Sequence, residues 1–119
     1  MGTTKKYFYQ EEQLRFSDLC KALGHPARIS IIQMLSKGRT LNCSDFQSEI
    51  QLSLPTISRH CKILFQSGVI GYEVLGNNCF YRLDNRVLDQ IIEFFDSINT
   101  DSPSLTGQVY YPKNTFITN

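Results

Sequence analysis

Apolar residues recur every three or four positions through residues 11–35, a spacing that predicts two helices. The first helix is expected over residues 11–23, where four apolar residues share one face: Phe16, Leu19, Cys20 and Leu23. The second is expected to begin at His25-Pro26, because proline is favoured in the first turn of a helix, and to reach Lys37-Gly38. Its buried stripe is expected to contain Ile29, Ile32 and Leu35, flanked by Ile31 and Met34.

Two more helical patterns follow, one short and one long. Cys43 or Ser44 is expected to cap the short helix, whose apolar residues are Phe46 and Ile50. Ser53 is a favourable N-cap for the long helix, which is expected to run to Gln66 and to stop at Ser67-Gly68. Only Ile57, Cys61 and Leu64 have the spacing of a buried stripe there. The long helix therefore has a wide polar side that must face something other than the core.

Strand patterns replace helical ones after Gly68. Residues 69–75 and 79–83 are rich in β-forming residues, and Gly76-Asn77-Asn78 between them tolerates the backbone of a tight turn, so a hairpin is expected. A last helix is expected over residues 85–98. Two helices joined by a tight connection and followed by a hairpin make a winged helix-turn-helix. The predicted fold class is mainly α with a small β-hairpin wing.

Composition sets the scale but does not decide the function. A chain of 119 residues with 41% hydrophobic and 19% charged residues suits one globular domain, expected over residues 1–98, with a surface tail over 99–119. The tail is polar, although its Tyr110, Tyr111, Phe116 and Ile117 could anchor it. The net charge of +1 is nearly neutral, so the distribution of charge matters more. No acidic residue lies between Glu49 and Glu73, which leaves Arg59, His60 and Lys62 in an acid-free window.

Several runs of sequence together are familiar: KALGHPARISIIQML, LPTISRHCKIL, SGVI and CFYRL. Over about residues 16–98 the chain resembles the ArsR-type winged-helix repressors of bacteria and archaea. The resemblance implies a homodimer, paired through its first and last helices, in which each winged helix reads one half-site of an operator. It also implies that Thr56, Ser58, Arg59 and His60 approach DNA, and we expect Lys62 to add attraction for phosphate.

The last helix independently favours a dimer, because its apolar surface is wider than one core-facing stripe requires. The residues expected at the interface are Leu19, Leu88, Ile91, Ile92 and Phe95. An alternative is that the tail, or the aromatic run of residues 7–9, covers this surface within one chain.

The chain departs from the family pattern where metal-sensing members carry two cysteines separated by one residue. In LNCSDF these positions are Asn42 and Ser44, and the last helix contains no histidine, so we expect no metal site and no cofactor. The inducer is left open, with an unknown small molecule as one candidate. Thiol-based sensing through Cys43, with Cys20 as its partner, is a second candidate, since a helix N-terminus lowers the pKa of a thiol.

The sequence bears on two other classes of function, an enzyme and a module that binds only proteins. An enzyme is not expected, because His60 and Cys61 are adjacent on one helix and point about 100° apart. A winged helix that binds only proteins stays open, because the wing tip lacks positive charge and Glu73 would repel phosphate. With no C-x-x-C pair, no signal peptide and no apolar run of about 20 residues, a cytosolic protein with reduced cysteines is expected.

Overall fold

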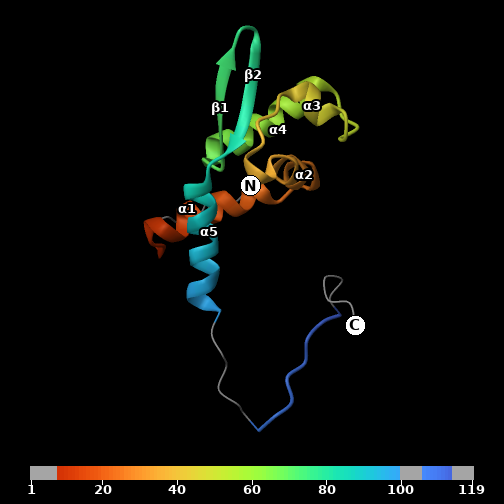
Figure 1. The fold of residues 1–119 in the computed structure, drawn as a ribbon. Coiled ribbons are helices and arrows are strands. Elements are labelled where there is room, and N and C mark those ends of the chain that lie inside the picture. Colours follow the sequence, from red (N-terminus) through yellow and green to blue (C-terminus); the bar gives the residue numbers. More distant parts are fainter. Residues whose placement is uncertain (1–7, 100–105, 114–119) are drawn as a thin grey trace.

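The computed structural model describes residues 8–99 and 106–113. In chain order the elements are α1 (Glu11–Leu23), α2 (Pro26–Met34), the 3₁₀ turn η2 (Ser36–Gly38), α3 (Cys43–Gln47), α4 (Leu54–Ser67), β1 (Ile70–Leu75), β2 (Asn78–Leu83) and α5 (Asn85–Ile98). The predicted fold class is confirmed: helices surround one core, and the β-hairpin projects from it on the side opposite to α5 (Figure 1).

The bounds of α1 and α5 agree with the prediction, but the buried stripe of α2 does not. Ile31 and Leu35 are fully buried and Ala27 nearly so, whereas the predicted Ile29 is exposed. Four-residue spacing from Ala27 to Leu35 puts these three side chains on the face that α2 turns to the core. On α1 the predicted Cys20 is likewise exposed, and Ala22 is buried in its place.

Side-chain caps stabilise the first turns of α3 and α4, the two helices of the helix-turn-helix. The cap of α3 is Asn42 and not Cys43 or Ser44: its side chain accepts from the Asp45 N–H, and the Asp45 carboxylate accepts from the Asn42 N–H in return. This reciprocal pair is a capping box, and it holds the first turn of a five-residue helix that could not persist alone. Ser53 caps α4 as predicted.

The hairpin after α4 has a tighter turn than predicted. β1 and β2 pair antiparallel from Ile70 opposite Leu83 to Leu75 opposite Asn78, so only Gly76 and Asn77 lie between the strands. Gly76 has φ of 62°, a left-handed value that glycine adopts without strain. The backbone of Tyr81 also exchanges two hydrogen bonds with Leu41, which ties the wing to the chain before α3.

The core lies where α1, α2, α3 and α4 meet the base of the hairpin. Its fully buried side chains come from α2 and its C-cap, α3, α4 and the base of the hairpin: Ile31, Leu35, Phe46, Ile57, Cys61, Leu64 and Val69. α1 contributes Leu19 and Ala22, which are 4% and 5% exposed. The stripe predicted for α4 is therefore confirmed. Among the described residues, no helix combines the length and the apolar composition needed to cross a bilayer.

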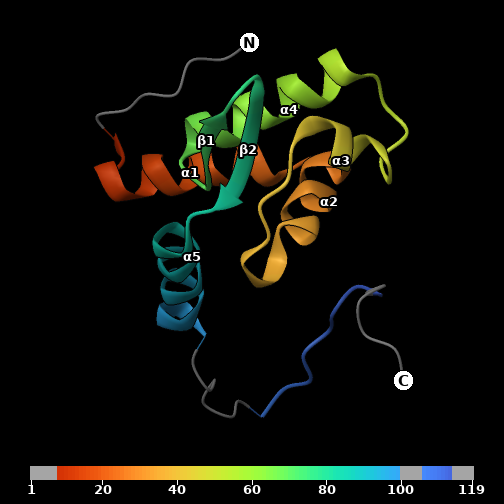
Figure 2. The ribbon, with the colours of Figure 1, turned by 45° about the horizontal axis from the view of Figure 1, so that its top comes forward.

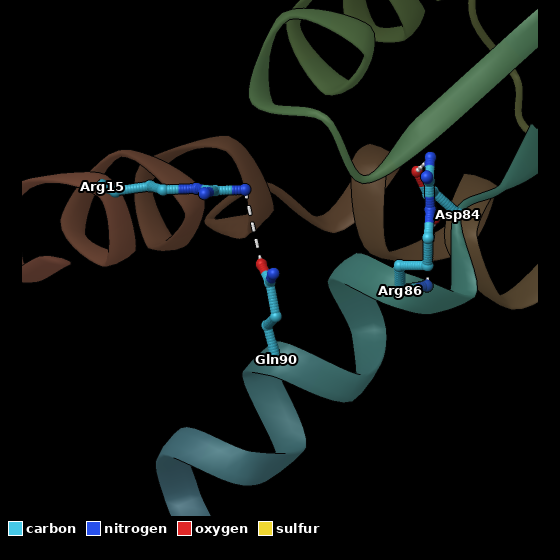
Figure 3. A network of polar contacts seen from close by, with 4 residues as sticks. All are labelled: Arg15, Asp84, Arg86 and Gln90. Atoms are coloured by element: carbon cyan, nitrogen blue, oxygen red, sulfur yellow. Dashed lines mark hydrogen bonds and ion pairs between the residues drawn. The ribbon is translucent and has the colours of Figure 1, made fainter.

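The start of α5 reaches this core through Val87, with Leu88 and Ile91 packed against it, whereas the last turns of α5 and the described part of the tail lie outside it. α5 extends away from the wing (Figure 2) and contacts α1, where the rings of Phe16 and Phe94 stack with centroids 3.9 Å apart. The Arg15 guanidinium also donates to the Gln90 side-chain oxygen across the same contact (Figure 3). Tyr110 and Tyr111 are both 83% exposed, so they do not anchor the tail, and Phe116 and Ile117 lie outside the described residues.

Candidate nucleic-acid interface

The exposed side of α4 carries three of the five residues predicted to approach DNA. Ser58, Arg59 and Lys62 are all exposed, and their spacing of three and four residues places them on one face of the helix. The buried stripe lies on the opposite side. Because α4 contains two basic residues and no acidic one, this face is locally positive although the whole chain is nearly neutral. We call Ser58, Arg59 and Lys62 the reading face.

Thr56 and His60, the other two predicted residues, lie on the flank of α4 and are only partly exposed. The Thr56 hydroxyl is hydrogen-bonded to the Ser53 hydroxyl at 2.9 Å, next to the cap of the helix. The Nδ1 atom of His60 accepts from Arg28 Nε at 3.1 Å. The side chains of Thr56 and His60 therefore form hydrogen bonds within the protein, whereas the three residues of the reading face are turned to solvent.

The start of α4 lies beside the wing tip and the start of α3. A shallow hollow of about 370 Å³ separates these elements and is lined by Asn42, Cys43, Ser44, Leu54, Pro55, Ser58, Asn77, Asn78 and Cys79. The two asparagines of the wing therefore lie near Ser58, which the sequence pattern did not indicate because they are about twenty residues away along the chain.

The wing itself offers a mixed surface. Tyr72, Val74 and Leu75 are exposed apolar residues of β1, and Glu73 is exposed between them. Arg82 is exposed on β2 opposite Gly71, so the base of the wing carries a positive charge although the tip carries none. A basic side chain attracts the phosphate backbone of DNA, whereas the uncharged tip adds no such attraction.

The expectation of a reactive thiol at Cys43 is not supported by its surroundings. Burial raises the pKa of the Cys43 thiol, and this effect outweighs a hydrogen bond with Cys61 that lowers it. Burial also raises the pKa of Cys61 to about 12. The prediction relied on the N-terminus of α3, where the Asn42 side chain already accepts from the Asp45 N–H and the Asp45 carboxylate accepts from the Asn42 N–H. The neighbour of Cys43 is Cys61, while Cys20 is exposed on α1.

No group of three or more histidine, cysteine, aspartate or glutamate side chains within the described residues could hold a metal ion. The nearest approach to such a group is the set of Cys43, Cys61 and Cys79, whose thiols interact electrostatically. Burial raises the pKa of Cys43 and of Cys61, and a thiol with a raised pKa is a poor metal ligand, because the thiolate is the form that coordinates.

The residues predicted for a dimer interface separate into three groups. Leu19 is only 4% exposed and packs in the core of its own chain, so it has almost no surface to offer a partner. Leu88 and Ile91 are partly buried against that core. Ile92 and Phe95 are more than half exposed, as is Ile98 one turn further on. The apolar surface of α5 is thus uncovered by the described parts of the tail and of the N-terminal segment.

Comparison with known proteins agrees with this geometry. The model of the bacterial regulatory protein family arsR matches residues 25–72. The chain is 36% identical to the arsenical resistance operon repressor of Staphylococcus xylosus over 84 residues, which cover 71% of this chain and 80% of that repressor. A crystal structure of a possible transcriptional regulator for arsenical resistance is 27% identical, with a TM-score of 0.63 over 71% of this chain and 86% of that one.

A second solved structure shares the fold at lower identity. It is the homodimeric winged helix-turn-helix DNA-binding domain of a possible ArsR-family transcriptional regulator from Mycobacterium bovis. The identity is 16% and the TM-score 0.62, over 82% of this chain and 88% of that one.

Proposed function

Because this chain belongs to the ArsR family of transcriptional repressors, we propose that it binds double-stranded operator DNA as a homodimer, with α4 in the major groove. The observation that carries the proposal is the reading face: Ser58, Arg59 and Lys62 are exposed together, next to the wing, on a helix without acidic residues. Arg59 and Lys62 attract the phosphate backbone, and Ser58 can donate to or accept from a base edge. The family consists of DNA-binding regulators and not of enzymes.

The exposed apolar surface of α5 supports the homodimer. Ile92, Phe95 and Ile98 would stay in contact with water in a single chain, which is unfavourable for a surface of this size. A second copy related by a two-fold axis covers the same residues on both subunits. Such a dimer places its two copies of α4 about 34 Å apart, which matches half-sites one turn of DNA apart.

We propose that divalent metal ions do not act as the inducer. Asn42 and Ser44 replace the thiols of the family's metal-sensing members, and the Asn42 side chain is used as the cap of α3. A small molecule of unknown identity, or control by the abundance of the repressor, is the working alternative. Thiol sensing through Cys43 has less support, because burial raises the pKa of that thiol.

A titration with promoter DNA tests the proposed function. Fluorescence anisotropy would follow binding to a duplex from the chain's own promoter and to a scrambled duplex, for the wild type, Arg59→Ala and Lys62→Ala. Lys113→Ala is the matched control, because it removes one positive charge from the exposed tail. If Arg59 reads a base, its loss should weaken operator binding by about 1–3 kcal/mol and relax the sequence preference. If it contacts phosphate, both duplexes should lose affinity and the salt slope should fall by about 1.

A second candidate function, binding to a protein without DNA, has one observation in its favour, the exposed Tyr72, Val74 and Leu75 on the wing. The two candidates give opposite results in the same titration. A wild-type chain that binds neither duplex at low salt would exclude the repressor and leave the protein-binding function. Equal affinities of the Arg59 and Lys62 variants and the wild type would exclude the reading face.

A further inference from the structure

One arginine outside the reading face joins three helices. Arg28 lies in α2, and its Nη1 atom donates to the backbone oxygens of Lys21 at 3.2 Å and Ala22 at 2.9 Å, in the last turn of α1. Its Nε atom donates to Nδ1 of His60, in the middle of α4, at 3.1 Å. One rigid guanidinium therefore connects the end of the helix that contacts α5 with the helix that carries the reading face.

The Arg28 guanidinium is chemically suited to its acceptors on both α1 and α4. The last carbonyl groups of a helix lack partners within it and form the negative end of the helix dipole, so a guanidinium is well placed there. Arginine has only donors, so the hydrogen bond to His60 requires an unprotonated Nδ1 atom, and the neutral ring then carries its proton on Nε2.

The surroundings of His60 keep it in this neutral form. Burial lowers its pKa most, followed by the charges of His25, Arg28 and Arg59. The His25 ring lies against the His60 ring from the start of α2, with centroids 4.5 Å apart. Asp18 and Lys21 of α1 lie close to Arg28 in a neighbouring hollow. At neutral pH, His60 is therefore an acceptor for Arg28.

We propose that Arg28 is a positioning residue for DNA recognition, which sets the angle between α1 and α4 through its bonds to the end of α1 and to His60. The inference rests on the proposed homodimeric repressor. In a dimer that pairs through α5 and the α1 beside it, the orientation of α4 on α1 determines where both reading faces point. Two half-sites can be contacted together only if both faces meet successive major grooves, so a small tilt in each subunit disturbs the full operator more than one half-site.

Arg28→Lys tests the connection because it keeps the positive charge but lacks the planar guanidinium that serves the three acceptors together. Binding would be measured to a duplex with two half-sites and to a duplex with one. On the full operator we expect a loss on the order of 10-fold or more, the usual scale for a hydrogen bond with a charged partner. On the single half-site we expect a change of less than about 2-fold, the range of a substitution away from the contacts. The dimer should sediment like that of the wild type, and the melting temperature should fall because hydrogen bonds of Arg28 are lost, so binding would be measured well below it.

Arg39→Lys is the matched control, because Arg39 is exposed and its guanidinium makes no hydrogen bond within the part of the chain that the structure describes. A second pair of variants covers the case in which Arg28→Lys does not fold. In His60→Asn the amide oxygen can replace Nδ1 as the acceptor for Arg28, whereas in His60→Gln the amide reaches the position of Nε2 instead. A positioning role predicts that His60→Asn binds the full operator more tightly than His60→Gln.

The outcomes separate this inference from the function on which it rests. Equal losses on the two duplexes, or no loss on either, would refute the positioning role of Arg28 while the wild type still binds its operator. Tighter binding by His60→Gln than by His60→Asn would also refute it, since the outer nitrogen of His60 would then be the important one. A wild-type chain that binds neither duplex would remove the repressor function, and the inference with it.

Discussion

Shortening Phe95 should weaken the dimer without removing the fold, and the structure allows the size of the effect to be worked out. Phe95 is 52% exposed in the single chain, so about half of its side chain is available for burial against a partner. Complete burial of a phenylalanine side chain contributes about 1.5–3 kcal/mol, and half of that is about 0.8–1.5 kcal/mol for each copy. A two-fold interface contains the residue twice, so Phe95→Ala should cost about 2–3 kcal/mol per dimer.

This free energy corresponds to an increase in the dimer dissociation constant of roughly 30- to 150-fold. Sedimentation equilibrium over a range of concentrations would measure the constant. The substitution also removes the edge contact between Phe95 and Phe16, with ring centroids 5.7 Å apart, so chemical denaturation of the variant must be measured alongside. Val74→Ala is the matched control, because Val74 is 61% exposed but lies on the wing.

Equal dissociation constants for Phe95→Ala and Val74→Ala would refute the role of Phe95 in the dimer. A wild type that sediments as a monomer at micromolar concentrations would refute the dimer itself. The exposed surface of α5 would then have to be covered by another partner.

Four further predictions concern backbone strain, pH dependence, thiol chemistry and metal binding. Gly68→Ala should lower the free energy of unfolding by about 1–2 kcal/mol, because Gly68 ends α4 with φ of 88°, whereas Gly71→Ala, without a positive φ, should have a smaller effect in the same urea titration. Burial first, and then nearby positive charges, lower the pKa of His60 below its ordinary 6.5, so the unfolded chain binds the proton more readily than the folded chain. The free energy of unfolding should therefore be highest above pH 6.5 and should fall as the pH falls below that value. This pH dependence should be smaller in His60→Asn. Iodoacetamide should label Cys20 before Cys43, which mass spectrometry of partly labelled protein can show, and release of DNA by peroxide from the wild type but not from Cys43→Ser would contradict this view of the thiols. The purified protein should contain no stoichiometric zinc, and its DNA affinity should not respond to micromolar zinc, cadmium or arsenite; elemental analysis with one metal per chain would contradict this.

Local signals explain why so much of the fold could be predicted. Ser53 and Gly68 mark the two ends of α4 by side-chain capping and by a left-handed backbone, and both effects depend on neighbouring residues only. The spacing of Ile57, Cys61 and Leu64 then identifies the buried side, and by elimination the side that carries the reading face. The same periodicity puts Ser58, Arg59 and Lys62 on the polar side, whereas the approach of Ser58 and Arg59 to DNA is what the family resemblance implies.

The errors arise where several faces of a helix are apolar, or where the contact is remote in sequence. In α2 two apolar stripes compete, and only the packing of the other helices decides that Ile31 is buried and Ile29 exposed. For Cys43, burial raises the pKa of the thiol and the neighbouring thiol is that of Cys61, eighteen residues away, so the local sequence around Cys43 gives no sign of either. A periodic pattern shows that a residue is on a face, but it does not show what lies against that face.

The same limitation accounts for Leu19 and for the connection through Arg28. The pattern placed Leu19 on an apolar face of the first helix, and that face could have met a second subunit. In the folded chain it meets the core instead, and α1 reaches α5 through Phe16, one turn earlier. α1 is therefore packed between α5 and the core under α4. A movement of α1 would shift the surface proposed for assembly relative to the surface proposed for reading DNA. If α1 were held only at its contact with α5, it could rotate about that contact. The hydrogen bonds from Arg28 to the backbone oxygens in the last turn of α1 prevent this rotation, because they fix the C-terminal end of the helix.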